Sequence, residues 1–432
     1  MAQHAENAGS EAYGGRIFSA FHYYSLTRGL NHTYRLLIGL KQAVDGAILK
    51  DAVQMTMRRY PYLLVRRKNT PFETVLIPNP AEVVVKKSDA PIRVGSDESN
   101  GHLIAFSYEG NTVYLNVFHG LMDGRGCGNL VKTLLYYYCS SAYDPALSRD
   151  GVRVVGDTIA PEEYTDPFPR KVPKDCRAFV KKPLTSRTFH IRDDRRVHTG
   201  FPKYRCTIKI NENELVKFCR MNDGSPAALM SVVMCRAVAR LNPARKKPIR
   251  AGVVLDLRPA FRAPAAHHSL NDIIPIDFTE KIEHADFELQ NTAFRSQIFV
   301  KSDSETVLKN MDLTCRLLRL AQHLPSLALK RLMLGSIVPR RYSENTFMLS
   351  YVGKADYGAA QPYVEFVRVD VDTPQTGIVV EISAINGLFY IDTIFDFPEE
   401  LYLRAFCEEL DSLGIGYERG DLQPLVVPKC TY

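Results

Sequence analysis

Short apolar runs typical of β-strands alternate with helical segments along most of this 432-residue chain, and this alternation limits the folds open to it. In the first half, the pattern predicts a strand at 34–40, a helix from Asp45 to Pro61 and a hairpin around 109–111. The second half repeats the mixture, with strands or helices expected at 207–210, 212–221, 226–240, 249–257, 284–323, 348–352, 378–385, 389–395 and after Pro398. Together these elements predict an α/β protein with two layers built around two mixed sheets.

A stretch rich in proline and charge separates the two halves. It contains a charged run at 192–196 and six prolines, which are Pro161, Pro167, Pro169, Pro173, Pro183 and Pro202. Such a composition is typical of a connection between domains. We therefore expect a disordered polar tail at 1–15, an N-terminal half at 16–150, a crossover linker at 151–203 and a C-terminal half at 204–432.

The composition argues against several classes of protein. No run approaches the roughly 18 apolar residues of a membrane helix, and the N-terminal segment lacks the basic start and apolar core of a secretory signal. The nine cysteines include no C-x-x-C pair, so we expect no metal site and a reducing, cytoplasmic location. The net charge of +7 comes from basic pairs scattered among acidic residues. We therefore expect no nucleic-acid partner, and a monomer without a membrane span.

The segment 116–126 carries the most chemically suggestive residues. A predicted strand ends at His119, a turn follows, and a helix begins near residue 125. An imidazole held there can take a proton from a hydroxyl, amine or thiol and return it to a leaving group. If Asp123 is buried, its carboxylate requires a partner. Glycine permits unusual backbone angles in such a turn, and three occur here, Gly120, Gly124 and Gly126. Because H-x-x-x-D is short and common by chance, a structural histidine fits the spacing equally well.

This segment resembles the H-H-x-x-x-D-G signature of the chloramphenicol acetyltransferase, condensation-domain and alcohol acetyltransferase superfamily. Phe118 takes the place of the first histidine, while His119, Asp123 and Gly124 match the second histidine, the aspartate and the glycine. Three further landmarks follow the family's order, so the resemblance covers most of the chain: Arg59-Tyr60-Pro61-Tyr62-Leu63, Val254-Leu255-Asp256-Leu257-Arg258-Pro259 and Ser350-Tyr351-Val352-Gly353-Lys354-Ala355-Asp356.

The resemblance implies a fold and a set of roles. The fold would be two similar halves, each a mixed sheet with helices, which meet at a central active-site tunnel. His119 would be the general base on the acceptor nucleophile. Asp123 would pair with Arg258 and hold the loop in shape, without transferring protons. Ser350 would be the nearest candidate for stabilising the oxyanion. Gly353 would belong to the late motif strand.

The resemblance also implies the substrates. An acyl-CoA thioester, most simply acetyl-CoA, would be the co-substrate, and a small-molecule alcohol or amine would be the acceptor, with no permanently bound cofactor. Phe118 and the lack of a carrier-protein sequence favour a free-standing acyltransferase. Two alternatives stay open: a donor bound to an acyl carrier protein, and an inactive binding or scaffold module of the same fold. Basic residues should line the mouth that admits coenzyme A, and the candidates are Lys246, Lys247 and Arg250.

The sequence gives weaker evidence for a function of its other reactive side chains. Cys127 follows His119 closely enough for a Cys–His nucleophile pair to be considered, although the turn should point the two side chains apart. The pair His267-His268 has no Asp-Gly at the required distance, so we expect a solvated or substrate-lining role. The sequence assigns no role to His22. The aromatic run at 136–138 is interpreted as helix packing.

Overall fold

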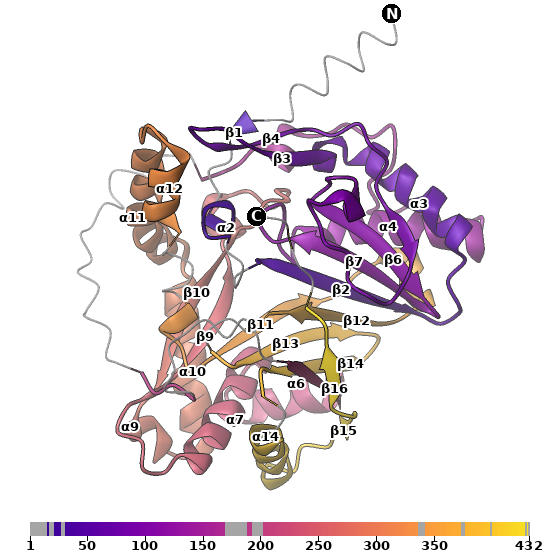
Figure 1. The fold of residues 1–432 in the computed structure, drawn as a ribbon. Helices are drawn as coiled ribbons and strands as arrows, with labels where there is room; N and C mark the ends of the chain where they lie inside the picture. The colour runs from indigo at the N-terminus through magenta and orange to yellow at the C-terminus, as the bar shows by residue number, and fades with distance from the viewer. Residues whose placement is uncertain are drawn as a thin grey trace, which may run out of the picture.

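The computed structural model describes residues 15–16, 21–26, 31–168, 188–191, 202–335, 342–372, 376–397, 400–427 and 430. Two large β-sheets and the helices that pack on them form two lobes (Figure 1). This is the mixed α/β architecture that the sequence predicts. Residues 1–14 and most of the expected linker lie outside the described residues, and the expected domain boundaries stay a prediction.

The sheet of the first lobe has the strand order β12-β2-β7-β6-β5. Its strands are β2 (Thr33–Leu40), β5 (Val85–Lys87), β6 (Ile104–Glu109), β7 (Thr112–Phe118) and β12 (Val364–Val371). All neighbours are antiparallel except β5 and β6. Two long helices, α3 (Gly46–Arg59) and α4 (Cys127–Ala142), pack against the sheet and share its apolar core. Asp45 begins α3 as expected, because its carboxylate accepts hydrogen bonds from the backbone N–H groups of Ala47 and Ile48 in the first turn of the helix.

The sheet of the second lobe has the order β10-β9-β11-β13-β14-β8-β15, and β16 also pairs with β8. Its strands are β8 (Lys203–Asn211), β9 (Ile249–Asp256), β10 (Asn271–Phe278), β11 (Phe347–Lys354), β13 (Ile378–Ile385), β14 (Leu388–Phe395), β15 (Glu418–Arg419) and β16 (Gln423–Leu425). The strand β11 runs parallel to both of its neighbours. One face packs on α6 (Glu212–Met221), α7 (Pro226–Leu241), α10 (Phe287–Ser302) and α14 (Leu401–Ser412), which leaves the other face toward the first lobe (Figure 1).

A third, small sheet and several helices complete the described fold. The small sheet contains β1 (Gly15–Arg16), β3 (Val65–Asn69) and β4 (Thr74–Pro78). The remaining α-helices are α2 (Phe21–Tyr24), α5 (Pro161–Tyr164), α8 (Arg258–Phe261), α9 (Glu280–Glu283), α11 (Ser304–Gln322) and α12 (Leu327–Leu334). The helices α8 and α11 contribute to a separate apolar cluster beside the main cores.

The structure differs from the sequence expectation at β10 and β12. The strand β10 is not among the expected strands, yet it pairs with β9 along its whole length. The strand β12 was not predicted at all. It comes from the second half of the chain but pairs with β2 in the first sheet. The alternation of apolar and polar residues at 367–371 is typical of a strand, but no local pattern shows that this strand joins the first sheet. Its residues Arg368 and Asp370 carry charges that pair with Asp392 and Arg205 of the second lobe.

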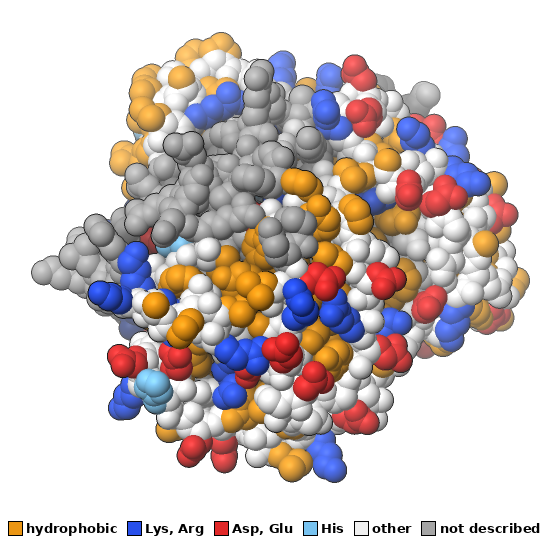
Figure 2. Space-filling model, turned by 60° about the horizontal axis from the view of Figure 1, so that its bottom comes forward, with side chains coloured by type: hydrophobic (Ala, Val, Ile, Leu, Met, Phe, Trp, Pro, Cys, Tyr) orange, Lys and Arg blue, Asp and Glu red, His pale blue; other side chains and the backbone are white. Residues whose placement is uncertain are grey.

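The charged residues of the surface are mixed in sign on the face that Figure 2 presents. Among the described residues there, lysines and arginines lie between aspartates and glutamates, without a patch of one sign. A nucleic-acid site on that face would require clustered positive charge. Among the described helices, none combines the length and the apolar character needed to cross a bilayer.

Candidate active site

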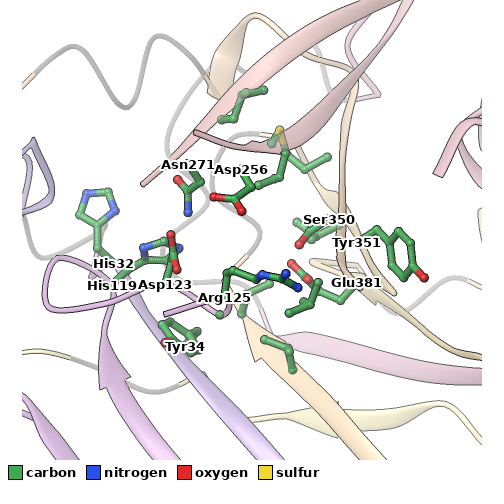
Figure 3. A pocket seen from close by; sticks show the side chains of 18 of the residues that line it. His32, Tyr34, His119, Asp123, Arg125, Asp256, Asn271, Ser350, Tyr351 and Glu381 are labelled. Carbon is green, nitrogen blue, oxygen red and sulfur yellow. The ribbon is translucent and has the colours of Figure 1, made fainter. Parts of the chain in front are cut away.

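A cavity of about 360 Å³ opens between the two lobes, where strand ends of both sheets face each other. The first lobe contributes β2 and the loop after β7. The second lobe contributes residues of β9, β10, β11 and β13. Figure 3 shows His119 and Asp123 on one side of this space and Ser350 and Glu381 on the other. The cavity is therefore lined by two predicted site residues, His119 and Ser350, that are more than two hundred positions apart in the sequence.

His119 follows β7 directly and is only partly accessible, from the cavity side. Its backbone N–H donates to the carbonyl of His32 at 2.7 Å. The ring nitrogen Nδ1 lies 3.0 Å from Oγ of Ser269. The ring also stacks on His22, with centroids 4.7 Å apart, and meets Tyr34 edge-on at 5.3 Å. These contacts hold the imidazole from several sides and leave Nε2 as the nitrogen for a substrate.

Burial lowers the pKa of His119 below its ordinary value, although the negative charge of Asp123 opposes this shift. A neutral ring is therefore present at neutral pH. The two histidines beside it behave alike, because burial lowers the pKa of His22 and lowers that of His32 to about 3. With a proton on Nδ1 directed toward Ser269, the lone pair of Nε2 is free to accept a proton.

Asp123 and Arg258 form a buried, bidentate ion pair between the two lobes. Nη2 and Nη1 of Arg258 donate to the two carboxylate oxygens at 2.8 and 3.1 Å. The backbone N–H groups of Gly126 and Leu270 donate to the same oxygens at 2.7 and 2.8 Å. The residues of the pair are 3% and 4% exposed. The carboxylate thus ties the loop after β7 to the segment that follows α8.

The glycines of the loop act through close packing, and the expectation of unusual backbone angles is wrong for them. None of Gly120, Gly124 and Gly126 has a positive φ. A Cβ on Gly126 would lie 2.2 Å from the carbonyl oxygen of His267, and one on Gly120 would lie 2.4 Å from the ring of Phe118. Only a hydrogen fits at either position.

The local structure explains the residue types at two other motif positions, Gly353 and Phe118. Gly353 has a φ of +98°, a backbone conformation that residues with a side chain rarely adopt, and it lies where β11 shifts its register against β13. Phe118 is fully buried and packs edge-on against Tyr23 at 4.8 Å. The ring thus belongs to the first core, and the position of the family's first histidine does not face the cavity here.

The three basic candidates for coenzyme A binding do not line the cavity. Arg250 is 3% exposed and pairs with Asp277, its partner across the β9–β10 ladder, with Nη2 to Oδ2 at 3.0 Å. Its guanidinium is thus already neutralised inside the second lobe, so the expectation for Arg250 is wrong. Lys246 and Lys247 are exposed between α7 and β9. Ser350, in contrast, lies on β11 and lines the cavity.

The structure also shows the surroundings of Cys127, His267 and His268, the reactive side chains for which the sequence offers weaker evidence of a function. The Sγ atom of Cys127 is fully buried and lies 2.7 Å from the hydroxyl of Tyr34, and burial raises the pKa of the thiol to about 12. A thiolate nucleophile is therefore disfavoured. His267 and His268 are 7% and 8% exposed, their rings contact backbone carbonyls of α5, and neither lines the cavity, so the expected solvated or substrate-lining role is wrong.

Sequence reasoning missed Ser269, His22 and Glu381. Ser269 follows the histidine pair directly, yet the serine, not the histidines, reaches His119. Its hydroxyl also lies 3.5 Å from Nε2 of His22. No local pattern marks any of the three, because each reaches the site only through the packing of the lobes.

Comparison of the sequence with models of known protein families finds no match, and neither does comparison with curated proteins. Solved structures do match. TRI101 of F. sporotrichioides, crystallised with coenzyme A and T-2, has 12% identity and a TM-score of 0.59 over 93% of this chain and 98% of that chain. Polyketide synthase associated protein 5 of Mycobacterium tuberculosis has 13% identity and a TM-score of 0.59, covering 93% and 97%. The first condensation domain of the CDA synthetase has 13% identity and a TM-score of 0.62, covering 93% and 95%.

These similarities extend over nearly the whole length of both chains in each pair, at identities where only the fold is conserved. They agree with the two sheets, the helices on their outer faces and the cavity between them. The chain therefore shares the fold of these solved structures, which is the fold expected from the resemblance to the chloramphenicol acetyltransferase-like superfamily.

Proposed function

We propose that this protein is an acyltransferase that moves an acyl group, most simply acetyl, from a coenzyme A thioester to a hydroxyl or amine of a small molecule. The observation that carries this proposal is the placement of His119. Its ring is neutral and fixed through Nδ1, and it borders a cavity between two lobes. The solved structures of similar fold include proteins bound to coenzyme A, which supports a thioester donor.

In the proposed reaction, Nε2 of His119 accepts the proton of the acceptor while the acceptor attacks the thioester carbonyl. The tetrahedral intermediate carries a negative charge on the former carbonyl oxygen. Its collapse expels the thiolate of coenzyme A, which takes the proton back from His119. The base is thus restored, and the products are an ester or amide and a free thiol. General base catalysis of this kind contributes about 10²–10⁴-fold to the rate.

Ser350 is our candidate for binding the oxyanion, because it borders the cavity from the lobe opposite His119. Its hydroxyl proton would turn from the carboxyl group of Glu381 to the oxyanion as the charge develops. One such donor contributes about 10²–10³-fold. Asp123 and Arg258 hold the loop of the base and take no part in proton transfer, because all four polar contacts of the carboxylate are already used.

The donor has two candidate sources. The similar structures include condensation domains, one of them with C8-CoA, so a carrier-bound acyl group deserves a direct comparison with acyl-CoA. Transfer from free acetyl-CoA supports the free-standing enzyme. Transfer only from acyl-phosphopantetheine on a carrier protein supports the alternative.

We also propose a reducing, cytoplasmic location. The eight described cysteines are all free and buried, which is compatible with such a compartment.

The proposal is tested by a thiol-release assay with acetyl-CoA and a panel of alcohols and amines, coupled to mass detection of the acylated product. The substitution His119→Ala should reduce turnover by about 10²–10⁴-fold. His119→Gln keeps more of the packing against His22 and should lose the same activity. The matched control is His323→Ala, because His323 is exposed at the end of α11 and should leave turnover unchanged. Full activity in both His119 variants would refute His119 as the base.

A further inference from the structure

Glu381 is a carboxyl group that the proposed mechanism does not use. It lies on β13, it is 8% exposed, and its side chain lines the same cavity as His119. In the sheet its register partners are Ser350 on β11 and Asp392 on β14. Side chains at paired positions project from the same face of a sheet, so these three form a polar row under the cavity.

The cavity is lined by more negative than positive side chains. Its lining contains four carboxyl groups and two guanidinium groups, which are Asp123, Asp256, Asp372, Glu381, Arg125 and Arg258. Arg258 binds both Asp123 and Asp256, and Asp372 lies 3.0 Å from Nζ of Lys203.

Within the described part of the chain, Glu381 is the acidic group of this lining that forms no ion pair. No ion pair joins it to any residue in the described ranges, although Ser350 hydrogen-bonds to its carboxyl group. Arg125 lines the same cavity, but its side chain is exposed. The neighbouring carboxylate of Asp392 is already bound by Arg368, with Nη2 to Oδ1 at 2.7 Å. Among the residues that the structure describes, no ion pair therefore neutralises Glu381 on the floor of the cavity.

The electrostatic state of Glu381 reflects this imbalance. Burial raises its pKa to about 8, the hydrogen bond from Ser350 opposes the shift, and the charge of Asp392 adds to it. An ionised carboxylate without a counter-charge costs free energy at a buried position. A ligand cation beside it would remove the cost and form a charge-assisted hydrogen bond.

We propose that the cavity selects acceptors that carry a protonated amine in addition to the group that is acylated, and that Glu381 binds this ammonium group. The inference rests on the proposed function and adds the substrate class. The reacting hydroxyl or amine lies at Nε2 of His119, and the ammonium group lies over β13. Where Glu381 is protonated, its proton passes to the solvent when the cation binds. Apolar side chains such as Val254, Val369 and Val379 line the same cavity and suit an aliphatic spacer between the two groups.

The test compares amino alcohols with diols of equal chain length, because each pair differs only in the charge at one end. Binding to the full chain is measured by calorimetry without a donor, and acetyl transfer to the hydroxyl is measured separately with acetyl-CoA. Wild type should bind the amino alcohol about 10- to 100-fold more tightly than the diol, since one charge-assisted hydrogen bond to a buried carboxylate supplies that difference. Glu381→Gln, a neutral isostere, should bind both equally.

The matched control is Glu109→Gln, which removes an exposed carboxylate at the far end of the β6–β7 hairpin and should keep the preference. Equal binding of the two ligands by wild type, or an unchanged preference in Glu381→Gln, overturns the proposal. A preference that depends on Glu381, in a protein that transfers no acetyl group from acetyl-CoA, supports the cation site and refutes transfer from acetyl-CoA. Transfer of acetyl groups without a preference for the amino alcohol supports the acyltransferase and refutes the cation site.

Discussion

The ion pair between Asp123 and Arg258 offers the most direct test of how this site is built. The substitution Asp123→Asn keeps the shape of the side chain but removes its charge. The amide NH₂ group also faces donors, because each carboxylate oxygen accepts from one nitrogen of Arg258 and from one backbone N–H. The guanidinium is left buried, with one of its two carboxylate partners lost.

The expected cost follows from the burial of both partners. Breaking a buried, hydrogen-bonded ion pair on one side costs about 3–5 kcal/mol. An unfolding entropy of about 2.1 cal/mol/K per residue makes each kcal/mol worth about 1 °C in the Tm of a chain of this length. The Tm of Asp123→Asn should therefore fall by about 3–5 °C, as measured by calorimetry, and urea unfolding should give the matching loss of free energy.

The control is the same substitution at Asp356. Its carboxylate lies 3.1 Å from Nζ of Lys132, but its side chain is 76% exposed, so Asp356→Asn should cost less than about 1 kcal/mol. A second variant, Asp123→Asn with Arg258→Met, removes both buried charges and should recover part of the stability. If Asp123→Asn has the same Tm as Asp356→Asn, the assignment of a structural ion pair is wrong.

Three further predictions concern the base and its neighbours. Because burial lowers the pKa of His119, the neutral base persists at neutral pH, and kcat/KM should fall only as the pH drops below the ordinary histidine value of about 6.5. Ser269→Ala removes the partner of Nδ1, so kcat should fall about 3- to 10-fold with little change in KM, and the acid limb of the pH profile should move to lower pH. An unchanged kcat and profile would show that Ser269 does not position the ring. Cys127→Ser should keep most of the turnover, since the buried thiol bonds to Tyr34 and is not ionised. Loss of turnover there, in a variant that melts like wild type, would restore the Cys–His pair as a candidate.

Local patterns predicted much of the fold. The strand β2, the helix α3 and the β6–β7 hairpin follow from apolar periodicity, a capping aspartate and turn residues, which act over a few positions. The pairing of β12 with β2 could not be predicted, because it joins residues more than three hundred positions apart. The charged residues of β12 also face partners that only the folded chain supplies.

For the candidate site, the sequence by itself determined the loop that carries His119 and Asp123, because the strand, turn and helix that shape it are local. Family resemblance added Arg258 as the partner of the aspartate. Only the tertiary structure decided that Ser269 contacts the base, that Glu381 faces the cavity and that Arg250 does not. The physical reason is that burial and pairing depend on which lobes and strands meet, and side chains that meet across a cavity need share no spacing along the chain.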